Sequence, residues 1–369
     1  MLARVSRPIS GIVDNNESLW GSVWNGHTID DPQILESVAG RLLVVICTTS
    51  VNDVMSQLAR FESPQLSAAI TSHLANQLPV RRLQECNPEI VFTSGEVRKV
   101  ESSGHHAGGL FTVDFHGTRE PKRHLEGSCH GLAFADGRYL VTSDADGLVL
   151  LDESLNLVKS VDVPGNPGLH GATFIPEAQQ FAVVATAWDS ILLLDLGLAV
   201  KQEIKLSRRP GVHAAHHCND LVSLGGNLFV SMFSESGFWR QGVYDGAVLA
   251  VDPSGSAPPY AVIRNLHMPH SPTVLDGELF VCDSLRGNLV GPLGKVVGEF
   301  SGFVRGLDFS GDYWLLGHSR NRNSGLVVGE APTVSIDNGF VLFDPKSSLF
   351  TFRHLPGEIS EIHAVMIRP

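Results

Sequence analysis

A six-residue line recurs six times along this chain and constrains its fold more than any other feature. The second position of each copy is polar, and an apolar residue follows four places later. The copies read CHGLAF (129–134), LHGATF (169–174), HHCNDL (216–221), PHSPTV (269–274), VRGLDF (304–309) and IHAVMI (362–367). Their second positions are His130, His170, His217, His270, Arg305 and His363. The copies lie roughly 35–60 residues apart, a period typical of repeat architectures.

Each period contains segments that alternate as short strands do. Residues 130–164 contain HGLAFA, RYLVTSD, GLVLLDE and LVKSVDVP, and the pairs Asp136-Gly137 and Asp146-Gly147 mark two of the turns between them. The next block repeats this order as HGATFI, QFAVVATA, SILLLDL and VKQEIKLS. Four short strands in each period predict the blades of a β-propeller.

The two ends of the repeat region complement each other. The last line, at 361–369, has no strands after it, whereas the strand-like segments 89–95, 109–115 and 121–127 lack a first strand. A C-terminal strand that completes the N-terminal blade would close the ring and leave no exposed sheet edge. We therefore predict an all-β fold, a six-bladed β-propeller over residues 86–369.

Residues 1–85 do not carry the blade pattern. The run LLVVIC (42–47) reads as a buried strand, 53–61 has helical spacing, and Ser63-Pro64 predicts the start of a second helix that Pro79 stops. The prediction is a small N-terminal α/β extension of a strand and two helices. It is a candidate for contact between copies in a homo-oligomer, or for covering the propeller.

Charge and cysteine content exclude several function classes. The net charge of −12, with 27 scattered basic residues, argues against a nucleic-acid partner. Five cysteines without CxxC spacing indicate a reducing compartment. The N-terminus lacks the apolar core of a signal peptide, and no apolar run is long enough to span a bilayer. We expect a soluble cytoplasmic protein with a small-molecule substrate and no membrane partner.

Three long loops are expected on the same face of the disc as the six marked positions. They span 95–109, 233–246 and 318–339, and each connects the second strand of a blade to the third. Within them, Trp239, Arg240 and Tyr244 are candidate substrate walls. Arg320 and Arg322 add positive charge to the mouth of an acidic protein, which suggests an anionic substrate.

Five histidines at six equivalent positions suggest a metal site. Imidazoles that converge on a narrow axis suit Zn, Fe or Mn, and three or four ligands leave an open position for chemistry. The predicted ligands are His130, His170, His217 and His270, although spacing alone does not decide which of the five histidines ligate. Alternatively, these polar side chains bind water in the channel.

Arg305 occupies the sixth equivalent position. A guanidinium could clamp an anionic group or stabilise a developing oxyanion, or it could form a structural ion pair with Glu361. By strand alternation, Asn219 and Glu361 are expected on the channel side, Asn219 as a substrate contact. His363 or Glu361 is the candidate that moves a proton.

From His216 onward the segments HHCNDL, PHSPTVLDG and GFVRGLDF resemble a family of uncharacterised bacterial propellers with the motifs WHxN, PHSP and GFxRGL. His216 stands where that family usually has Trp. The resemblance implies the fold but no reaction. The expected site is similar to that of peptidylamidoglycolate lyase, a six-bladed propeller with three histidines on a catalytic zinc and an arginine nearby. It is also similar to the carotenoid oxygenases, which hold iron with four histidines in a seven-bladed propeller.

These patterns favour a metal-dependent lyase or hydrolase that acts on a small polar, anionic substrate. One alternative keeps the histidine ring but makes the metal Fe(II) and the reaction oxidative. The other is a propeller without enzymatic activity, which binds a ligand or a protein partner.

Overall fold

The computed structural model describes residues 9–38, 41–48, 50–61, 66–70, 72–95, 108–207, 214–320, 334–359 and 361–368. The chain divides into two compact units, Met1–Arg81 and Arg82–Pro369. The first contains a small three-stranded sheet, a two-stranded sheet and helices, and the second is built almost wholly of strands.

The first unit opens with a sheet in the order β1-β3-β2. A parallel pair, β4 and β5, follows it. The elements are β1 (Ile12–Val13), η2 (Glu17–Leu19), β2 (Val23–Trp24), β3 (His27–Asp30), η3 (Pro32–Glu36), β4 (Leu42–Ile46), α1 (Val51–Ala59), β5 (Leu66–Ile70) and α2 (Ser72–Glu85). No helix in the described part of the chain is long and apolar enough to cross a membrane.

The second helix predicted for this unit is wrong in its bounds. Residues 66–70 form strand β5, and α2 begins only at Ser72 and continues through Pro79. The register of β4 with β5 runs from Leu42 opposite Leu66 to Ile46 opposite Ile70. Pairing with a strand distant in sequence thus outweighs the local helix signal, since strand formation depends strongly on the neighbours available.

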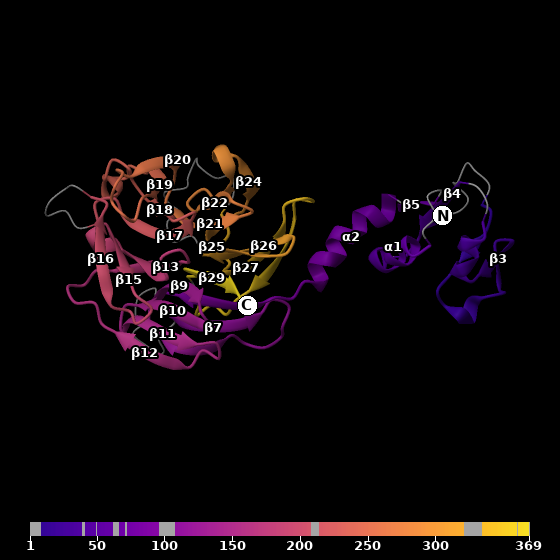
Figure 1. The fold of residues 1–369 in the computed structure, drawn as a ribbon, viewed down its shortest axis with the longest axis horizontal. Helices are drawn as coiled ribbons and strands as arrows, with labels where there is room; N and C mark the ends of the chain where they lie inside the picture. Colours follow the sequence, from indigo (N-terminus) through magenta and orange to yellow (C-terminus); the bar gives the residue numbers. More distant parts are fainter. Residues whose placement is uncertain are drawn as a thin grey trace. The chain divides into compact units, whose positions relative to one another are not determined.

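The second unit is a six-bladed β-propeller, in which six four-stranded antiparallel sheets surround an axis (Figure 1). Five blades are made of strands consecutive in sequence. They are β9 (Cys129–Ala135), β10 (Arg138–Ser143), β11 (Gly147–Asp152) and β12 (Leu157–Val161); β13 (Leu169–Ile175), β14 (Gln180–Ala185), β15 (Ser190–Leu194) and β16 (Val200–Lys205); β17 (Cys218–Leu224), β18 (Asn227–Met232), β19 (Gly246–Val251) and β20 (Tyr260–Leu266); β21 (Pro269–Leu275), β22 (Glu278–Asp283), β23 (Asn288–Val290) and β24 (Val296–Glu299); β25 (Phe303–Ser310), β26 (Tyr313–Ser319), β27 (Gly339–Asp344) and β28 (Leu349–His354). Short 3-10 turns η4 (Thr186–Trp188), η5 (Trp239–Gln241) and η6 (Pro292–Gly294) lie in the connections.

The sixth blade joins the two ends of the propeller sequence. Its strands, in the order β29-β6-β7-β8, are β29 (Val365–Ile367), β6 (Glu89–Ser94), β7 (Gly109–Asp114) and β8 (Lys122–Glu126). Val365 lies opposite Phe92 and Ile367 opposite Ile90 in an antiparallel ladder. The first strand of each blade contacts that of the next, so these strands line the axis.

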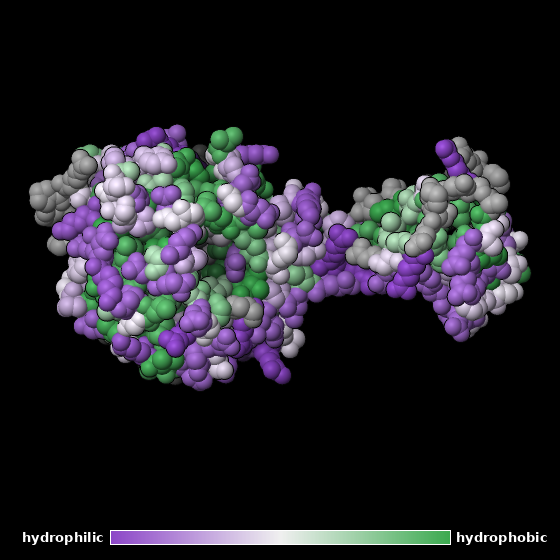
Figure 2. Space-filling model, viewed as in Figure 1, coloured by the Kyte–Doolittle hydropathy of each residue, from purple (hydrophilic) through white to green (hydrophobic). Residues whose placement is uncertain are grey.

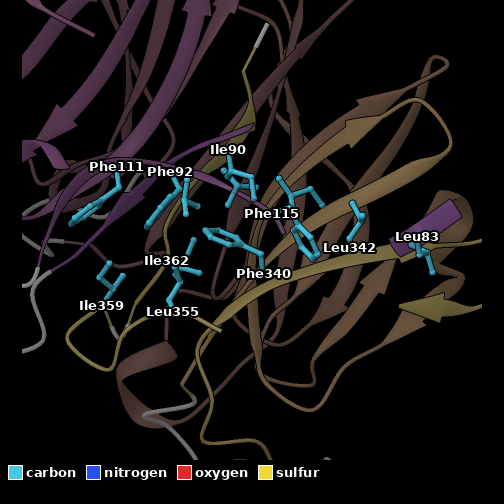
Figure 3. Close-up of a cluster of buried hydrophobic side chains, with 13 residues drawn as sticks. Leu83, Ile90, Phe92, Phe111, Phe115, Phe340, Leu342, Leu355, Ile359 and Ile362 are labelled. Carbon is cyan, nitrogen blue, oxygen red and sulfur yellow. The ribbon is translucent and has the colours of Figure 1, made fainter. Parts of the chain in front are cut away.

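Apolar side chains between neighbouring blades hold the ring together. In the cluster of Figure 3, Phe92 of the closing blade lies 5.0 Å from Phe340 of β27, edge to face, and 5.2 Å from Phe111. All three rings are at least 98% buried. Burial of a phenylalanine side chain stabilises a fold by about 1.5–3 kcal/mol. Contacts of this kind hold the blades, and therefore the inner strands, in fixed positions.

Candidate functional site

The six marked residues, called the axial ring below, lie at or just before the starts of the inner strands. In the first complete blade, Cys129 pairs with Ser143 and Leu132 with Val141, so His130 and its neighbour form an irregularity in the ladder. The break also includes the ring residue in β13 and β25, at His170 and Arg305. In β17 and β21 the break follows the ring residue and begins at Asn219 and Ser271. A bulge redirects the side chain that it carries, and bulges are frequent next to functional sites.

Hydroxyl groups from the second strands hold these irregular segments in place. The Oγ1 atom of Thr142 accepts a hydrogen bond from the amide of Gly131 at 2.6 Å and donates to the carbonyl of His170, in the next blade, at 2.7 Å. Thr93 donates to the carbonyl of His130 in the same way. Backbone groups that the broken ladder leaves without a strand partner are thereby satisfied. His130 and His170 are thus each held by a threonine of the preceding blade.

At two of the positions that directly follow a ring residue in sequence, neighbouring inner strands approach too closely to leave room for a side chain. A Cβ atom on Gly131 would lie 2.2 Å from the carbonyl oxygen of His170, and one on Gly171 would lie 2.6 Å from the Cα of Asp220. This crowding explains why His130 and its equivalent in the next blade are each followed by glycine.

Three ring histidines form a polar cluster. The rings of His130 and His170 are stacked, with centroids 4.5 Å apart and planes at 18°. His363 meets His130 edge to face, also at 4.5 Å. The Nδ1 atoms of His130 and His363 are 3.3 Å apart.

Carboxylates lie at the outer nitrogens of both of these rings. His130 donates from Nε2 to Asp144 at 3.1 Å, and the Nε2 of His363 is 3.5 Å from Glu361 Oε2. Each carboxylate favours a proton on the adjacent Nε2. In the neutral rings, the two Nδ1 lone pairs then face each other, an arrangement that a cation between them would stabilise.

Arg305 and Glu361 form a buried ion pair beside this cluster. Each side chain is about 5% exposed, and the guanidinium donates to Glu361 Oε2 at 3.1 Å and to the carbonyl of Ile362 at 2.6 Å. The ion pair considered from the sequence is therefore present. It places one positive and one negative charge at the edge of the axial ring.

His270 is held by hydrogen bonds at both nitrogens. Its Nδ1 lies 2.9 Å from the carbonyl of Met268 and 2.8 Å from Ser284 Oγ, and its Nε2 lies 2.9 Å from Asn219 Nδ2. A proton on Nδ1, donated to the carbonyl, leaves Nε2 to accept from the amide of Asn219. The lone pair of Nε2 is then already engaged, and Asn219 serves to orient the ring.

His217 lies among aromatic side chains. Its ring is 4.3 Å from Phe233 and 4.5 Å from Trp239. It also lies 6.2 Å from the ring of His170, so the contacts between rings continue from the polar cluster to the mouth loop.

Burial keeps three of the imidazoles uncharged. It lowers the pKa of His170, His270 and His363 well below the usual 6.5, and the positive charge of Arg305 adds to the effect on His270 and His363. Neutral imidazole is the form that binds metal ions.

The mouth residues predicted as substrate walls lie on the loop between β18 and β19. Trp239 is half-buried and donates from its indole to the carbonyl of Ala214 at 2.8 Å. The exposed guanidinium of Arg240 lies 5.2 Å above that indole, and Tyr244 is half-buried. Arg320 is exposed just after β26. Residues 96–107 and 321–333 of the other two mouth loops, Arg322 among them, lie outside the described residues.

Several residues of the site were not singled out from the sequence. One sequence signal could have identified three of them. Two second strands end in the similar segments FTSG (92–95) and VTSD (141–144), which contain Thr93, Thr142 and Asp144. Phe233 and Phe303 carry no such signal, because their role depends on which strand ends meet at the axis.

The donor set of the polar cluster fits a metal ion only in part. Two nitrogens bound to one tetrahedral ion at about 2.0–2.1 Å are about 3.3–3.4 Å apart, and the Nδ1 atoms of His130 and His363 have this separation. The stacked rings of His130 and His170 cannot both direct in-plane lone pairs at one point. Within the described ranges, no three His, Cys, Asp or Glu side chains are grouped as a complete metal site.

The fold and the site define this protein as a six-bladed β-propeller with an axial ring of histidines. Figure 2 shows a depression near the centre of one propeller face. Residues 216–369 match the model of a family described as a domain of unknown function, DUF4915. No curated protein matches the sequence.

Solved structures resemble the chain in fold. A protein of unknown function from Bacteroides caccae superposes with a TM-score of 0.52 at 14% identity, covering 75% of this chain and 98% of its own. A chain from a nidogen/laminin complex gives 0.51 at 13% identity, covering 76% and 97%. A protein described as a putative gluconolactonase gives 0.48 at 14% identity, covering 66% and 83%. At these identities the likeness concerns the fold and not the reaction.

Proposed function

We propose that this protein is a metal-dependent enzyme, a lyase or hydrolase that acts on a small polar, anionic substrate at the axial ring. The observation that carries the proposal is the approach of the Nδ1 atoms of His130 and His363 to 3.3 Å. Their outer nitrogens face carboxylates, so both lone pairs are directed into the same space. The proposed ligands are these two nitrogens of His130 and His363, with His170 as the adjacent third imidazole.

This ligand set differs from the four histidines expected from the sequence. His270 is left out because Asn219 engages its Nε2, and His217 is left out because it packs against Phe233 and Trp239. His170 donates through Nδ1 to the carbonyl of Gly168 at 3.1 Å, which leaves its Nε2 as the acceptor, but its ring would have to turn out of the stack to ligate.

A divalent ion of Zn, Fe or Mn bound there would act as a Lewis acid on a carbonyl or similar group. Asp144 holds the His130 ring in the tautomer with Nδ1 unprotonated. Arg305 supplies a buried positive charge that attracts an anionic group, and Ile362 and Glu361 fix its orientation. Glu361 Oε2 is the proposed proton acceptor.

Elemental analysis of protein purified without a polyhistidine tag tests the proposal. Wild type is expected to carry about one metal ion per chain, and His130→Ala and His363→Ala are expected to lose it. His318→Gln, in a buried histidine of β26 outside the axial ring, is the matched control and should retain the metal.

Two outcomes would contradict the proposal. One is folded wild-type protein that binds no metal even after incubation with Zn²⁺, Fe²⁺ or Mn²⁺, in which case a shared proton bridges the two nitrogens. The other is full metal content in both alanine variants. Iron that co-purifies, together with oxygen consumption, would select the oxidative alternative.

A further inference from the structure

The axial ring is polar on one side and aromatic on the other. His217 packs against Phe233 and Trp239, and the ring of His270 lies 5.2 Å from Phe233 and 5.4 Å from Phe303. We call Phe233, Trp239 and Phe303 the aromatic wall. Phe303 also lies 5.5 Å below the guanidinium of Arg305, so the wall continues to the buried positive charge.

This wall is separate from the apolar clusters that join the blades. Its two phenylalanines belong to a distinct cluster with Met268 and Leu285, against which Trp239 and Tyr244 pack. These residues lie at the strand ends next to the axial ring, just after β18 and β22, just before β21 and at the start of β25. They therefore lie beside the axial ring, at the mouth end of the inner strands.

The loop that supplies Trp239 exposes further apolar side chains. Phe238 is 40% exposed and Val243 is 43% exposed. The loop has a well-defined base, because Asp245 accepts hydrogen bonds from Ser234 Oγ and, at 3.0 Å, from the amide of Ser236. An apolar surface held in this way is suited to contact with a ligand.

We propose that the substrate carries an aromatic or similarly flat apolar group, which packs against the aromatic wall and Phe238 while its anionic group reaches Arg305. Only the part of this inference that places the anionic group at Arg305 rests on the proposed function. Contacts between rings run from His130 through His170 and His217 to Trp239, at 4.5, 6.2 and 4.5 Å, and connect the polar cluster with the loop that carries Phe238. Aromatic groups bury large areas and pack favourably on other rings.

The test compares two probes that differ only in the ring, 3-phenylpropionate and propionate. Both are titrated calorimetrically into the full-length protein, whose metal content is measured on the same samples. We expect 3-phenylpropionate to bind at least about 10-fold more tightly to wild type. In Trp239→Leu and Phe238→Ser the preference should fall below about 3-fold. Phe350→Ser, which removes a 55% exposed aromatic side chain from the outer strand β28, should keep it.

The inference is overturned by equal binding of the two probes to wild type, by no binding of either at millimolar concentration, or by an undiminished preference in both variants. Phe238→Ser removes an exposed side chain, so it remains informative if Trp239→Leu fails to fold. Wild-type protein that contains metal but does not prefer 3-phenylpropionate would overturn this inference and leave the metal-dependent function standing. A clear preference in protein that binds no metal would overturn the metal-dependent function and leave the aromatic wall as a ligand site.

Discussion

His130, from the first complete blade, and His363, just before the last strand of the chain, face each other across 3.3 Å through their Nδ1 atoms. This approach exists because the C-terminal strand β29 joins the blade that begins at β6. The closure of the ring therefore assembles the site as well as stabilising the fold.

Asp144 is expected to orient His130 for metal binding. Asp144→Asn weakens the preference for the tautomer with a free Nδ1, so metal affinity should fall by roughly 10- to 100-fold. Competition with a chromophoric chelator measures this change. Asp146→Asn is the control, because Asp146 instead accepts a hydrogen bond from Ser143. Unchanged affinity in Asp144→Asn would argue against His130 as a ligand.

Thr142 is expected to stabilise the axial ring through its hydroxyl. Thr142→Val keeps the shape but leaves the amide of Gly131 and the carbonyl of His170 without this partner in a fully buried position, so the free energy of unfolding should fall by about 2–3 kcal/mol. Thr142→Ser keeps the hydroxyl and should lose only about 1 kcal/mol. Urea denaturation compares the two, and a valine variant as stable as the serine variant would contradict the assigned role.

The buried pair of Arg305 and Glu361 is expected to show strong coupling. Glu361→Leu leaves the buried guanidinium without this carboxylate and should cost about 3–5 kcal/mol of stability. The double variant Arg305→Met/Glu361→Leu should lose clearly less than the sum of the single variants. Denaturation of the four proteins in a double-mutant cycle measures the coupling, and simple additivity would show that the two charges do not depend on each other.

Acid should destabilise the fold through His270 and His318. Burial lowers the pKa of both in the folded state, whereas in the unfolded chain each titrates near 6.5. Below that pH the unfolded state binds protons that the folded state does not, so stability is present above about pH 6.5 and is lost as the pH falls. Together the two residues can make the free energy of unfolding fall by up to about 2.7 kcal/mol for each unit by which the pH is lowered.

Unfolding by urea at several pH values between 7 and 5 measures this slope. His318→Gln should reduce it by about one proton, with the wild-type curve as the reference. A slope that does not change in His318→Gln would show that folding does not lower the pKa of this histidine.

The sequence predicts the propeller well, because blades repeat a local pattern. The recurring line, the Asp-Gly turns and the missing first strand at residues 89–127 were enough to predict six blades, and the structure confirms this fold. The extension was harder to predict, since the strand at Leu66–Ile70 forms only by pairing with Leu42–Ile46 and has no strong local signal of its own.

From the sequence alone we predicted that six residues share an equivalent place at the axis, since a strand position repeated in every blade occupies an equivalent place in the ring. The structure aligns Asn219 rather than His217 with His130, because the register of β17 breaks after Cys218. The sequence could not divide these residues by role. A loop of the same blade brings Phe233 and Trp239 onto His217. In contrast, side-chain contacts between blades decide that Asn219 engages His270 and that His130 meets His363. These contacts join residues far apart in the chain, so they depend on the angle between blades, which only the packed tertiary structure sets.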